Sequence, residues 1–432
     1  MFKTLIDAFK IKEVRTKMLI TLGLLFLYIL GTWIPVPGID TSIFGATVNA
    51  EGQDFLTLLS SVSGGALANG AILALGVSPY ISSSIIVQLL TVAIPSLEKI
   101  SKQGEEGRKK INKLTRYAAL VLAIAQSIGI VVAFNKNGSA ITDVLFGNVT
   151  LTSIYVVIML VAGSMFTVWL GEKITDVGVG NGQSLLIFIG ILSSASVALL
   201  SAFKNIFAND IDELWGLLIF IALLLLIFAL IVFIDKAERR ISVNYAKQMK
   251  GRRMMGGQKT NIPLRVNGSG VMPIIFASAF LSFPQLIMSI FWPNTPAYTW
   301  YAENMGAGTW LYSVILPILI LFFAFFYSQI VFNPDEVAKQ IQENGGFITN
   351  IRPGKPTAEY LKKINNRIVL FGAIFLAFIS LIPSLLFSLV EVGSLINAFT
   401  ATGMMIIVSV ALELDKSLSA QLMVRNYRGF LK

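Results

Sequence analysis

The sequence predicts an all-α membrane protein that crosses the bilayer ten times. Of its 432 residues, 55% are hydrophobic and only 13% are charged, a composition typical of polytopic membrane proteins. The apolar residues are gathered into segments without Asp, Glu, Lys or Arg, and each approaches the ~20 residues that a helix needs to cross the hydrocarbon core. Ten such segments follow one another along the chain: 18–37, 71–94, 117–134, 151–171, 183–203, 214–234, 271–292, 311–332, 368–390 and 392–412.

The distribution of basic residues predicts the orientation. An even number of spans places both termini on one side, and 32 of the 34 Lys and Arg residues lie in the segments expected there. Only Lys136 and Lys204 lie on the other side. Because basic loops stay in the cytoplasm, we expect cytoplasmic termini. Residues 1–17 are basic and amphipathic, and the apolar segment after them is too long for a signal peptide, so we expect a retained first span.

Ten spans divide into five plus five. Two halves with an odd number of spans run in opposite directions, so a structural repeat in this chain would be inverted. The pore or binding site of such folds lies between the halves. We expect an N-terminal half at 1–204, a connection at 205–213, a C-terminal half at 214–412 and a cytoplasmic tail at 413–432.

The second span is expected to be broken. Residues 64–93 carry no charge, but glycines and a proline interrupt them: Gly64, Gly65, Gly70, Gly76 and Pro79. Unwound backbone at membrane depth is tolerated where it is buried in protein or lines a water-filled cavity. The alternative is a plain span whose small residues permit close helix packing. Residues 55–70 form a further apolar segment that is too short to span alone.

The composition also bounds the chemistry. The chain has no Cys and no His, which removes thiol nucleophiles, disulfides, Cys/His metal sites and histidine proton relays. It has no GxxxxGK[ST] phosphate-binding motif, so we expect no enzymatic activity and no cofactor. None of the spans contains Asp, Glu, Lys or Arg, which argues against a proton-coupled transporter. A sodium-coupled or facilitative carrier stays open.

Two long basic loops, 235–270 and 333–367, are expected on the cytoplasmic side. The positive-inside pattern and weak attraction to anionic lipid would account for their charge. Docking of a large anionic or acidic partner such as a ribosome would account for it equally, because Arg pairs bind phosphate well. The candidate pairs are Arg239–Arg240 and Arg252–Arg253.

Six motifs resemble those of the SecY family, the central subunits of the protein-conducting translocation channel. They occur in order and with matching spacing over essentially the whole chain: LALGVSPYISSSIIVQLL (73–90), WLGEKITDVGVGNGQSLLIF (169–188), ERRISVNYAK (238–247), LRVNGSGVMPIIFAS (264–278), VFNPDEVA (331–338) and IRPGKPTAEY (351–360). Each motif is moderately specific, and six in register are highly specific. The lengths of both loops and the IRPG sequence suggest the bacterial form.

The resemblance implies a clamshell of two five-helix halves around an hourglass pore, closed at its waist by a ring of apolar side chains. The matching positions are Val77, Ile81, Gln183, Ile187, Ile275 and Ile406. Residues 77 and 81, and likewise 183 and 187, are four apart, so each pair faces one way on a helix. Gln183 departs from the family's aliphatic residue, and we expect it to wet the constriction. Without the motifs, ordinary helix packing would explain the isoleucines.

The resemblance also implies a short re-entrant plug helix at 55–70 and a lateral gate. The plug candidates are Phe55, Leu58, Leu59, Ser63, Gly64, Gly65 and Leu67. The family's gate lies between the second and third spans on one side and the seventh and eighth on the other, and it releases hydrophobic segments into lipid. The candidates for polar contacts across this gate are Ser82, Gln88 and Asn267.

The partners implied by the resemblance are a ribosome or the SecA motor ATPase at the two basic loops, SecE as a clamp behind the halves, and a peripheral SecG. The candidate docking residues are Arg239, Arg240, Arg252, Arg253 and Arg352. Arg352 matches the family's arginine for motor-driven transport. The substrates are signal sequences and nascent polypeptides, and the location is the bacterial plasma membrane.

Two other classes of protein are alternatives for this sequence, and each predicts a different site. A secondary transporter of a small solute, built on inverted repeats, would gather polar side chains around a broken helix at midplane. A scaffold or insertase without a continuous pore would keep the loops but would not need the ring. A translocation channel requires an apolar ring, a plug and docking loops, and the six motifs favour it.

Overall fold

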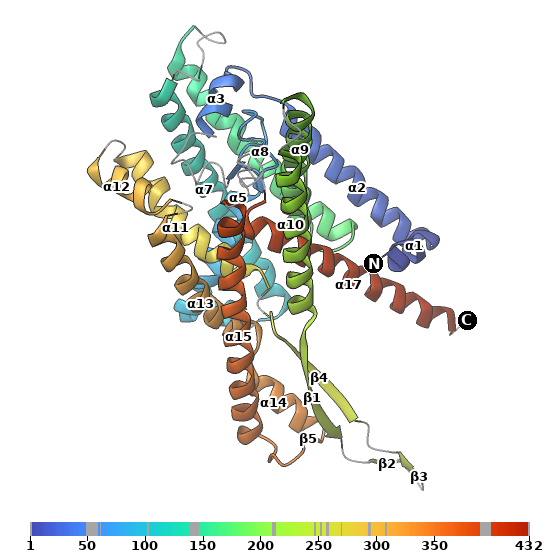
Figure 1. The fold of residues 1–432 in the computed structure, drawn as a ribbon. Coiled ribbons are helices and arrows are strands. Elements are labelled where there is room, and N and C mark those ends of the chain that lie inside the picture. The colour runs from blue at the N-terminus through green and yellow to red at the C-terminus, as the bar shows by residue number, and fades with distance from the viewer. Residues whose placement is uncertain are drawn as a thin grey trace.

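Figure 1 shows a bundle of long helices with a small β-sheet at one end. In this computed structural model, the residues described are 2–48, 59–60, 62–101, 103–138, 141, 147–209, 213–245, 248–250, 253–255, 259–268, 270–292, 295–306, 309–388 and 399–430.

Each predicted span overlaps one helix, in some cases over only part of its length. These helices are α2 (Lys12–Trp33), α5 (Ser78–Ala93), α7 (Glu105–Gly138), α8 (Val149–Val177), α9 (Gly182–Asn209), α10 (Glu213–Lys236), α11 (Met272–Phe291), α13 (Trp310–Val331), α15 (Lys355–Ser388) and α17 (Ala401–Phe430). By length and composition, seven helices in the described part could cross a membrane, or eight if the bent pair α5–α6 is one span. The total of ten spans stays a prediction, because α11 and α17 lie outside this set.

Shorter helices join the long ones. They are α1 (Phe2–Lys10), α3 (Thr41–Val48), α6 (Pro95–Ser101), α12 (Pro296–Asn304) and α14 (Pro334–Glu343). Helices α5 and α6 meet at an angle of 107°. Ile94 lies between them in extended backbone, with φ −108° and ψ 112°. Pro95 causes this break, because a proline disfavours helical backbone in the residue before it.

The two basic loops fold together into a sheet, which the all-α prediction did not anticipate. The strands are β1 (Glu238–Tyr245), β2 (Gln248–Lys250), β3 (Arg253–Met255), β4 (Lys259–Arg265) and β5 (Gly346–Ile348). β1 lies at the centre of an antiparallel sheet, between β4 and β5. Val243 of β1 is in register with both Thr260 and Ile348. The β2–β3 hairpin extends beyond this sheet (Figure 1).

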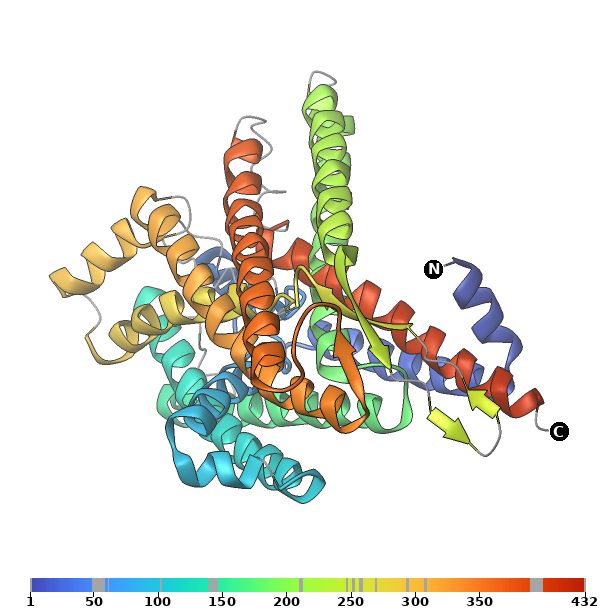
Figure 2. The same cartoon turned by 90° about the horizontal axis from the view of Figure 1, so that it is seen from below.

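The sheet has a hydrophobic core of its own. Ile241 and Val243 are buried while Arg240 and Ser242 are exposed, as expected for side chains that alternate along a strand. Their neighbours in this core come from β4, β5, α14 and the start of α15: Leu264, Ala338, Ile341, Ile348, Ala358, Leu361 and Ile364. We call β1, β4, β5, α14 and residues 355–367 the sheet module. Figure 2 shows β1, β4 and β5 in front of the helical bundle.

Two large hydrophobic cores lie within the helical bundle. The first joins the segment after α2, residues 59–75, α7 and α8; its buried members include Val36, Leu67, Leu75, Phe134, Val156 and Leu160. The second joins α9, α10, α11, α13, α15 and α17; its buried members include Phe220, Ile227, Ile274, Phe276, Ile320 and Met404. A third cluster draws residues from both halves. The candidate pore residues fall in this third cluster.

The helices α9, α10 and α17 extend beyond the limits predicted for the two halves. α9 continues to Asn209 and α10 begins at Glu213, so most of the predicted connection at 205–213 is helical. α17 runs without interruption through the predicted tail to Phe430. Near that end, Leu418 packs with Ala8 of α1, which brings the two terminal helices together. The division into two halves stays a prediction.

Candidate pore and plug

Five of the six candidate ring side chains belong to one hydrophobic cluster. Val77, Ile187 and Ile406 are buried, with exposed fractions of 2%, 8% and 5%. Ile81 and Ile275 pack against the same cluster and are partly buried. These side chains come from α5 and the residue before it, α9, α11 and α17, and so from both predicted halves. These side chains form an apolar cluster between the two helical cores.

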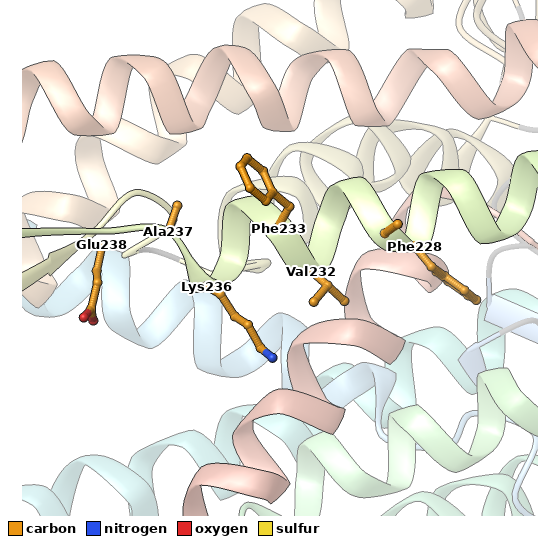
Figure 3. A pocket seen from close by; sticks show the side chains of 7 residues that line it. Phe228, Val232, Phe233, Lys236, Ala237 and Glu238 are labelled. Carbon is orange, nitrogen blue, oxygen red and sulfur yellow. The ribbon is translucent and has the colours of Figure 1, made fainter.

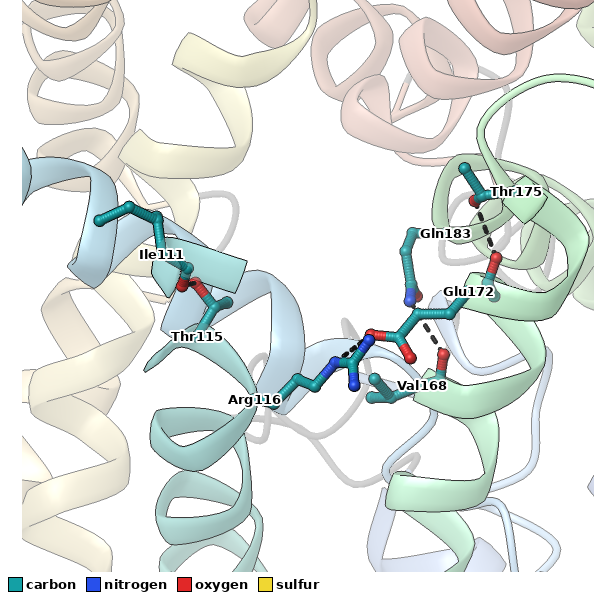
Figure 4. Close-up of polar contacts among 8 residues, drawn as sticks. Ile111, Thr115, Arg116, Val168, Glu172, Thr175 and Gln183 are labelled. Carbon is teal, nitrogen blue, oxygen red and sulfur yellow. Dashed lines mark hydrogen bonds and ion pairs between the residues drawn. The ribbon is translucent and has the colours of Figure 1, made fainter. Parts of the chain in front are cut away.

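Gln183, the sixth candidate, is tied to α8. Its Nε2 donates to the carbonyl of Val168 at 3.1 Å, as Figure 4 shows. Gly171 makes room for this contact, because a Cβ there would lie 2.5 Å from Gln183 Cδ. Within the described residues, the Oε1 atom of Gln183 has no hydrogen-bond partner. This hydrogen bond to α8 therefore accounts for a polar residue at position 183. Its expected effect on wetting stays a prediction.

The turn between α8 and α9 is fixed by hydroxyl groups that the sequence analysis did not single out. Thr175 Oγ1 donates to Gly171 O at 2.9 Å and accepts from Gly182 N at 2.9 Å. Thr21 Oγ1, on α2, accepts from Val179 N at 3.1 Å. The GVGNG stretch of the second motif was the available signal. These bonds fix the start of α9, the helix that carries Ile187.

The plug candidates lie partly within the described residues. Phe55 and Leu58 lie outside them. Leu59, Ser63 and Leu67 are buried, whereas Gly64 and Gly65 are partly exposed. Residues 63–70 and 72–77 form consecutive turns instead of a regular helix. The expected plug helix is therefore an irregular segment over this stretch, and its role as a plug stays a prediction.

The second span is broken, as predicted. Within the predicted span 71–94, α5 begins only at Ser78, with Pro79 in its first turn. The unwound residues before it are mostly buried and their backbone is bonded to neighbouring elements. Three of these bonds are Val36 N to Gly70 O at 2.9 Å, Ile72 N to Ile34 O at 3.0 Å, and Ser164 Oγ to Gly76 O at 3.2 Å. This satisfies the requirement that irregular backbone at membrane depth be buried in protein.

The described hydrogen bonds of the gate candidates do not cross the expected gate. Gln88 Nε2 donates to Ser84 Oγ of the same helix at 3.2 Å. Asn267 Nδ2 donates to Asp235 Oδ1, at the end of α10, at 2.8 Å. Ser82 is partly exposed on α5. The helices themselves are adjacent, because α7 contacts α11. The assignment of these three residues to a gate stays a prediction.

Gln126 is a buried polar residue that sequence reasoning missed. It lies on α7, the helix that contacts α11, and is 5% exposed. Its Oε1 atom has no partner within the described residues. The available signal was a single amide inside the apolar segment 117–134. A buried side-chain oxygen without a hydrogen-bond partner is an exception in folded proteins.

The docking arginines lie on and near the sheet module. Arg240 binds Glu238 through its Nε and Nη2, at 2.8 Å in each case. Within the described residues, the guanidinium groups of Arg239 and Arg352 form no ion pair, and both side chains are exposed or partly exposed. Arg252 lies outside the described residues, and Arg253 lies in β3. Among the residues that the structure describes, the module therefore presents at least two cations that are open to a partner.

Arg352 lies in a tight turn between β5 and α15. Gly354 has a φ of 94°, a left-handed conformation that glycine adopts without strain. Thr357 Oγ1 then donates to Arg352 O at 2.8 Å and closes the turn onto α15. This geometry explains why the IRPG motif requires its glycine.

Charged groups also gather where the sheet module joins the bundle. Burial lowers the pKa of Lys416, on the extension of α17, and the nearby Arg265 lowers it further. Asp235, Glu238 and Glu413 oppose this shift. The module is thus linked electrostatically to the helix that carries Ile406.

An open groove of about 780 Å³ follows the end of α10. Figure 3 shows its apolar wall, formed by Phe228, Val232 and Phe233, and the charged groups of Lys236 and Glu238 beside it. Phe233 is 72% exposed. Exposed apolar side chains next to a charged group are expected where a span leaves the hydrocarbon core. The groove therefore lies where the predicted span 214–234 ends.

The fold and this site define a class of protein: a multi-pass membrane protein whose two helical cores meet at an apolar cluster beside a buried, unwound segment. Comparison with known proteins identifies the family. The model of the SecY family matches residues 71–414. The chain belongs to the SecY family.

Full-length relatives agree with this assignment. The chain is 42% identical to "Protein translocase subunit SecY" of Streptomyces coelicolor, with 98% of each chain covered. It is 40% identical to the Buchnera aphidicola protein of the same name, with 94% of this chain and 92% of that chain covered. The Mycobacterium bovis protein of that name is 38% identical, with 100% of each chain covered.

Solved structures share the fold. One described as "The structure of a protein conducting channel" has a TM-score of 0.62 and covers 94% of this chain and 91% of its own. Another, whose description assigns a membrane-sealing role to the plug domain of the SecY protein, has a TM-score of 0.65 with the same coverage. "Sec61 in the Canine ribosome-channel complex" has a TM-score of 0.61, also with the same coverage. Each is 18% identical to this chain.

Proposed function

We propose that this chain is the central subunit of a protein-conducting channel. It passes unfolded secretory polypeptides across the membrane and releases hydrophobic segments sideways into lipid. The single observation that carries this proposal is the apolar cluster at the junction of the two helical cores, built from Val77, Ile187 and Ile406 with Ile81 and Ile275 around them. Relatives named as translocase subunits, at about 40% identity over their whole length, support it.

The mechanism follows from the apolar character of the constriction. A polypeptide must cross without a leak of ions, so the waist needs a compliant seal with little affinity for any one side chain. Aliphatic side chains close around any sequence, and a narrow apolar constriction resists wetting. Hydrophobic segments leave sideways because partition into lipid stabilises them. The chain makes and breaks no bond in this mechanism, so a partner supplies the energy.

We place the chain in the bacterial plasma membrane with both termini in the cytoplasm. The segregation of 32 of the 34 basic residues supports this orientation, because basic loops are retained on the cytoplasmic side. The bacterial organisms of the relatives named as translocase subunits support the choice of membrane.

The sheet module is then cytoplasmic and takes the docking role. Arg239 of the module, together with Arg352 in the turn between β5 and α15, suits an acidic or phosphate-rich partner, such as the SecA motor or the ribosome. SecE clamps the two halves from behind, and SecG binds at the periphery. The lateral gate lies at the seam where α7 contacts α11, with Ser82, Gln88 and Asn267 as its polar residues.

The site does not favour a solute transporter. Such a protein would line its broken helix with convergent polar side chains. In the unwound stretch 71–77, the buried side chains are Ala71, Leu73, Ala74, Leu75 and Val77. An apolar lining of this kind offers a small polar solute no partners.

Site-specific crosslinking tests the proposal. A photo-reactive residue replaces Ile81, Ile187 or Ile275, and a secretory chain is stalled partway through translocation. Adducts from all three positions are expected, because the stalled chain would fill the ring. A control position at Lys355, in the 333–367 loop, reports docking at the surface. Efficient crosslinking at Lys355 without adducts at the ring would contradict the channel. It would indicate a docking platform or a transporter instead.

A further inference from the structure

Helix α12 contacts α11 beside a proline. It lies against α11 and α13 at the edge of the bundle (Figure 1). Tyr301 of α12 is 9% exposed, and its hydroxyl donates to Leu281 O of α11 at 2.6 Å. Leu281 lies three positions before Pro284, which is inside α11. A proline removes one hydrogen bond of its helix, and groups from neighbouring elements support the backbone at such a place. Tyr301 therefore fixes α12 to the middle of α11.

This contact sets the depth of α12 in the membrane. Ile275, also on α11, packs against the apolar cluster of the ring. Leu281 is six residues further along the helix, which places it at most about 9 Å further out. With the ring at the middle of the bilayer, where such folds place their pore or site, the hydrocarbon core ends about 15 Å from the ring. Tyr301 therefore lies in the outer half of the bilayer, and an exposed side chain beside it meets lipid.

Trp300 is such a side chain. It is 55% exposed, although Tyr301 next to it is buried. Consecutive residues lie about 100° apart around a helix, so α12 has an inward face and an outward face. Tryptophan is enriched at the membrane–water interface, where its ring meets the acyl chains and its N–H reaches polar groups. Trp300 therefore suits the outer edge of the hydrocarbon core.

The other tryptophans indicate the same side of the membrane. Of the six in the chain, five are exposed and lie at or between ends of spans that are predicted to face outward: Trp33, Trp215, Trp292, Trp300 and Trp310. Trp292 and Trp310 flank α12, at the end of α11 and the start of α13. The stretch 293–309 contains one charged residue, Glu303, and no Lys or Arg. The sequence around α12 is therefore aromatic and without positive charge.

We propose that α12 is a brace for α11 that binds the outer leaflet of the membrane. Trp300 binds the ester and glycerol region of phospholipids, and Tyr301 holds the backbone of α11 beside Pro284. This rests on the proposed channel function and its orientation. Because α12 has no basic residue, it recognises the neutral interfacial region that phospholipids share, and not an anionic headgroup. Lipid thereby positions the outer half of α11, the helix that carries Ile275.

A fluorescent label that leaves Trp300 in place measures the depth of α12. The chain has no cysteine, so Ala297→Cys creates one label site. Ala297 is exposed and lies three residues before Trp300, on the same face of the helix. The NBD-labelled complete channel complex is reconstituted in phosphatidylcholine vesicles. Lipids brominated near the carbonyl end of their acyl chains are expected to quench the label more strongly than lipids brominated near the methyl end, because an interfacial helix lies at the acyl boundary.

Two tryptophan substitutions in the Ala297→Cys background test the role of Trp300. Trp300→Ala is expected to cause loss of most of the quenching. Trp215→Ala is the matched control, because it removes an exposed tryptophan near the start of α10 and should leave the quenching unchanged. Quenching that persists in the Trp300→Ala variant would overturn the role of Trp300.

Two further outcomes bear on the partner. A label at Ala297 that neither brominated lipid quenches would overturn the contact with the membrane. Quenching that appears only after an anionic lipid is added would overturn the recognition of the neutral interfacial region.

Tyr301→Phe tests the contact with α11, because it removes the hydroxyl and keeps the ring. Amide hydrogen exchange of α11 around Leu281 is expected to become about fivefold faster in the complete complex, as the loss of one buried hydrogen bond implies. Tyr298→Phe is the control and should leave the exchange unchanged. Tyr298 lies in the same helix, and its hydroxyl forms no hydrogen bond within the described residues. Unchanged exchange in the Tyr301→Phe variant would overturn the brace.

Crosslinking separates failure of the brace from failure of the proposed function. If exchange is unchanged in the Tyr301→Phe variant while a stalled secretory chain crosslinks to a photo-reactive residue at Ile275, the brace alone is overturned. No crosslink at Ile275 in a complex without the Tyr301→Phe substitution would overturn the proposed function itself.

Discussion

The centre of the molecule and the sheet module are held together by different means. Around the ring and plug, apolar side chains and glycines pack closely; Gly163 lies directly against Ile72 O, as Gly190 does against Val62 O. In the sheet module, antiparallel pairing along the whole of β4 fixes two chain segments to each other. The exposed cations of the module therefore lie on a hydrogen-bonded sheet.

The difference follows from what each region must do under the proposed function. A constriction that changes its width is served by apolar contacts, which are non-directional and can be lost and regained over a range of positions. A docking surface must keep its shape while a partner binds, and paired strands with a core of their own provide that. Under the proposed function, the same chain therefore uses compliant contacts at the pore and directional contacts at the docking surface.

The largest expected effect tests whether the module is a separate unit. Leu361 is fully buried in the core of the sheet module. Leu361→Ala should destabilise that core by about 2–5 kcal/mol, the usual effect of truncating a buried leucine. Protease digestion of residues 235–270 should accelerate, while a stalled chain still crosslinks at Ile81.

Tyr360→Ala is the control for this experiment. Tyr360 precedes Leu361 and is 37% exposed, so its truncation should change stability by about 0.5 kcal/mol or less. Loss of crosslinking at Ile81 in the Leu361→Ala variant, with normal assembly, would show that the pore depends on the module for its shape.

The spans were predictable because the membrane imposes their composition. Every backbone polar group must be satisfied within the hydrocarbon core, so a long uncharged segment is read as a helix, and α8 and α10 lie where their segments predict. The break before α5 was predictable for the same reason, since Gly76 and Pro79 interrupt the segment. Local composition is enough for features of this kind.

The sheet was not predictable in this way. β5 pairs with β1 from a distant part of the chain, with Val243 in register with Ile348, and no local pattern specifies a partner at that distance. The direction of the Gln183 side chain was hidden for a similar reason. Gly171, on another helix, makes the room that Gln183 occupies. The motif placed Gln183 near the ring but could not say which neighbour its amide would bind.

A smaller effect is expected from Gln183→Leu, which places an aliphatic residue where the family has one. The substitution removes the hydrogen bond to Val168 O, and the loss of one such bond costs about 0.5–1.5 kcal/mol. If the amide is a tether to α8, resting ion conductance in reconstituted bilayers should not change. Thermal unfolding of the purified complex measures the loss of stability.

Ile187→Gln is the matched reference for Gln183→Leu, because it puts an amide at a position that is buried in the apolar cluster. It should raise the resting conductance, since a polar group favours wetting of a narrow constriction. A fall in conductance in the Gln183→Leu variant would instead place Gln183 in the pore, as the sequence alone suggested.

The smallest effect on stability is expected from Arg352→Glu. Its side chain is exposed and its guanidinium has no ion pair within the described residues, so the stability should change by about 0.5 kcal/mol or less. Motor-driven transport should nevertheless fall more than membrane insertion, because the charge reversal opposes an acidic partner at the tip of the IRPG turn. Lys355→Glu, in the first turn of α15, reverses an exposed charge nearby and should disturb transport less. Equal loss of transport and insertion in the Arg352→Glu variant would remove the special role of this arginine, and the module's cations would then act only as a general basic surface.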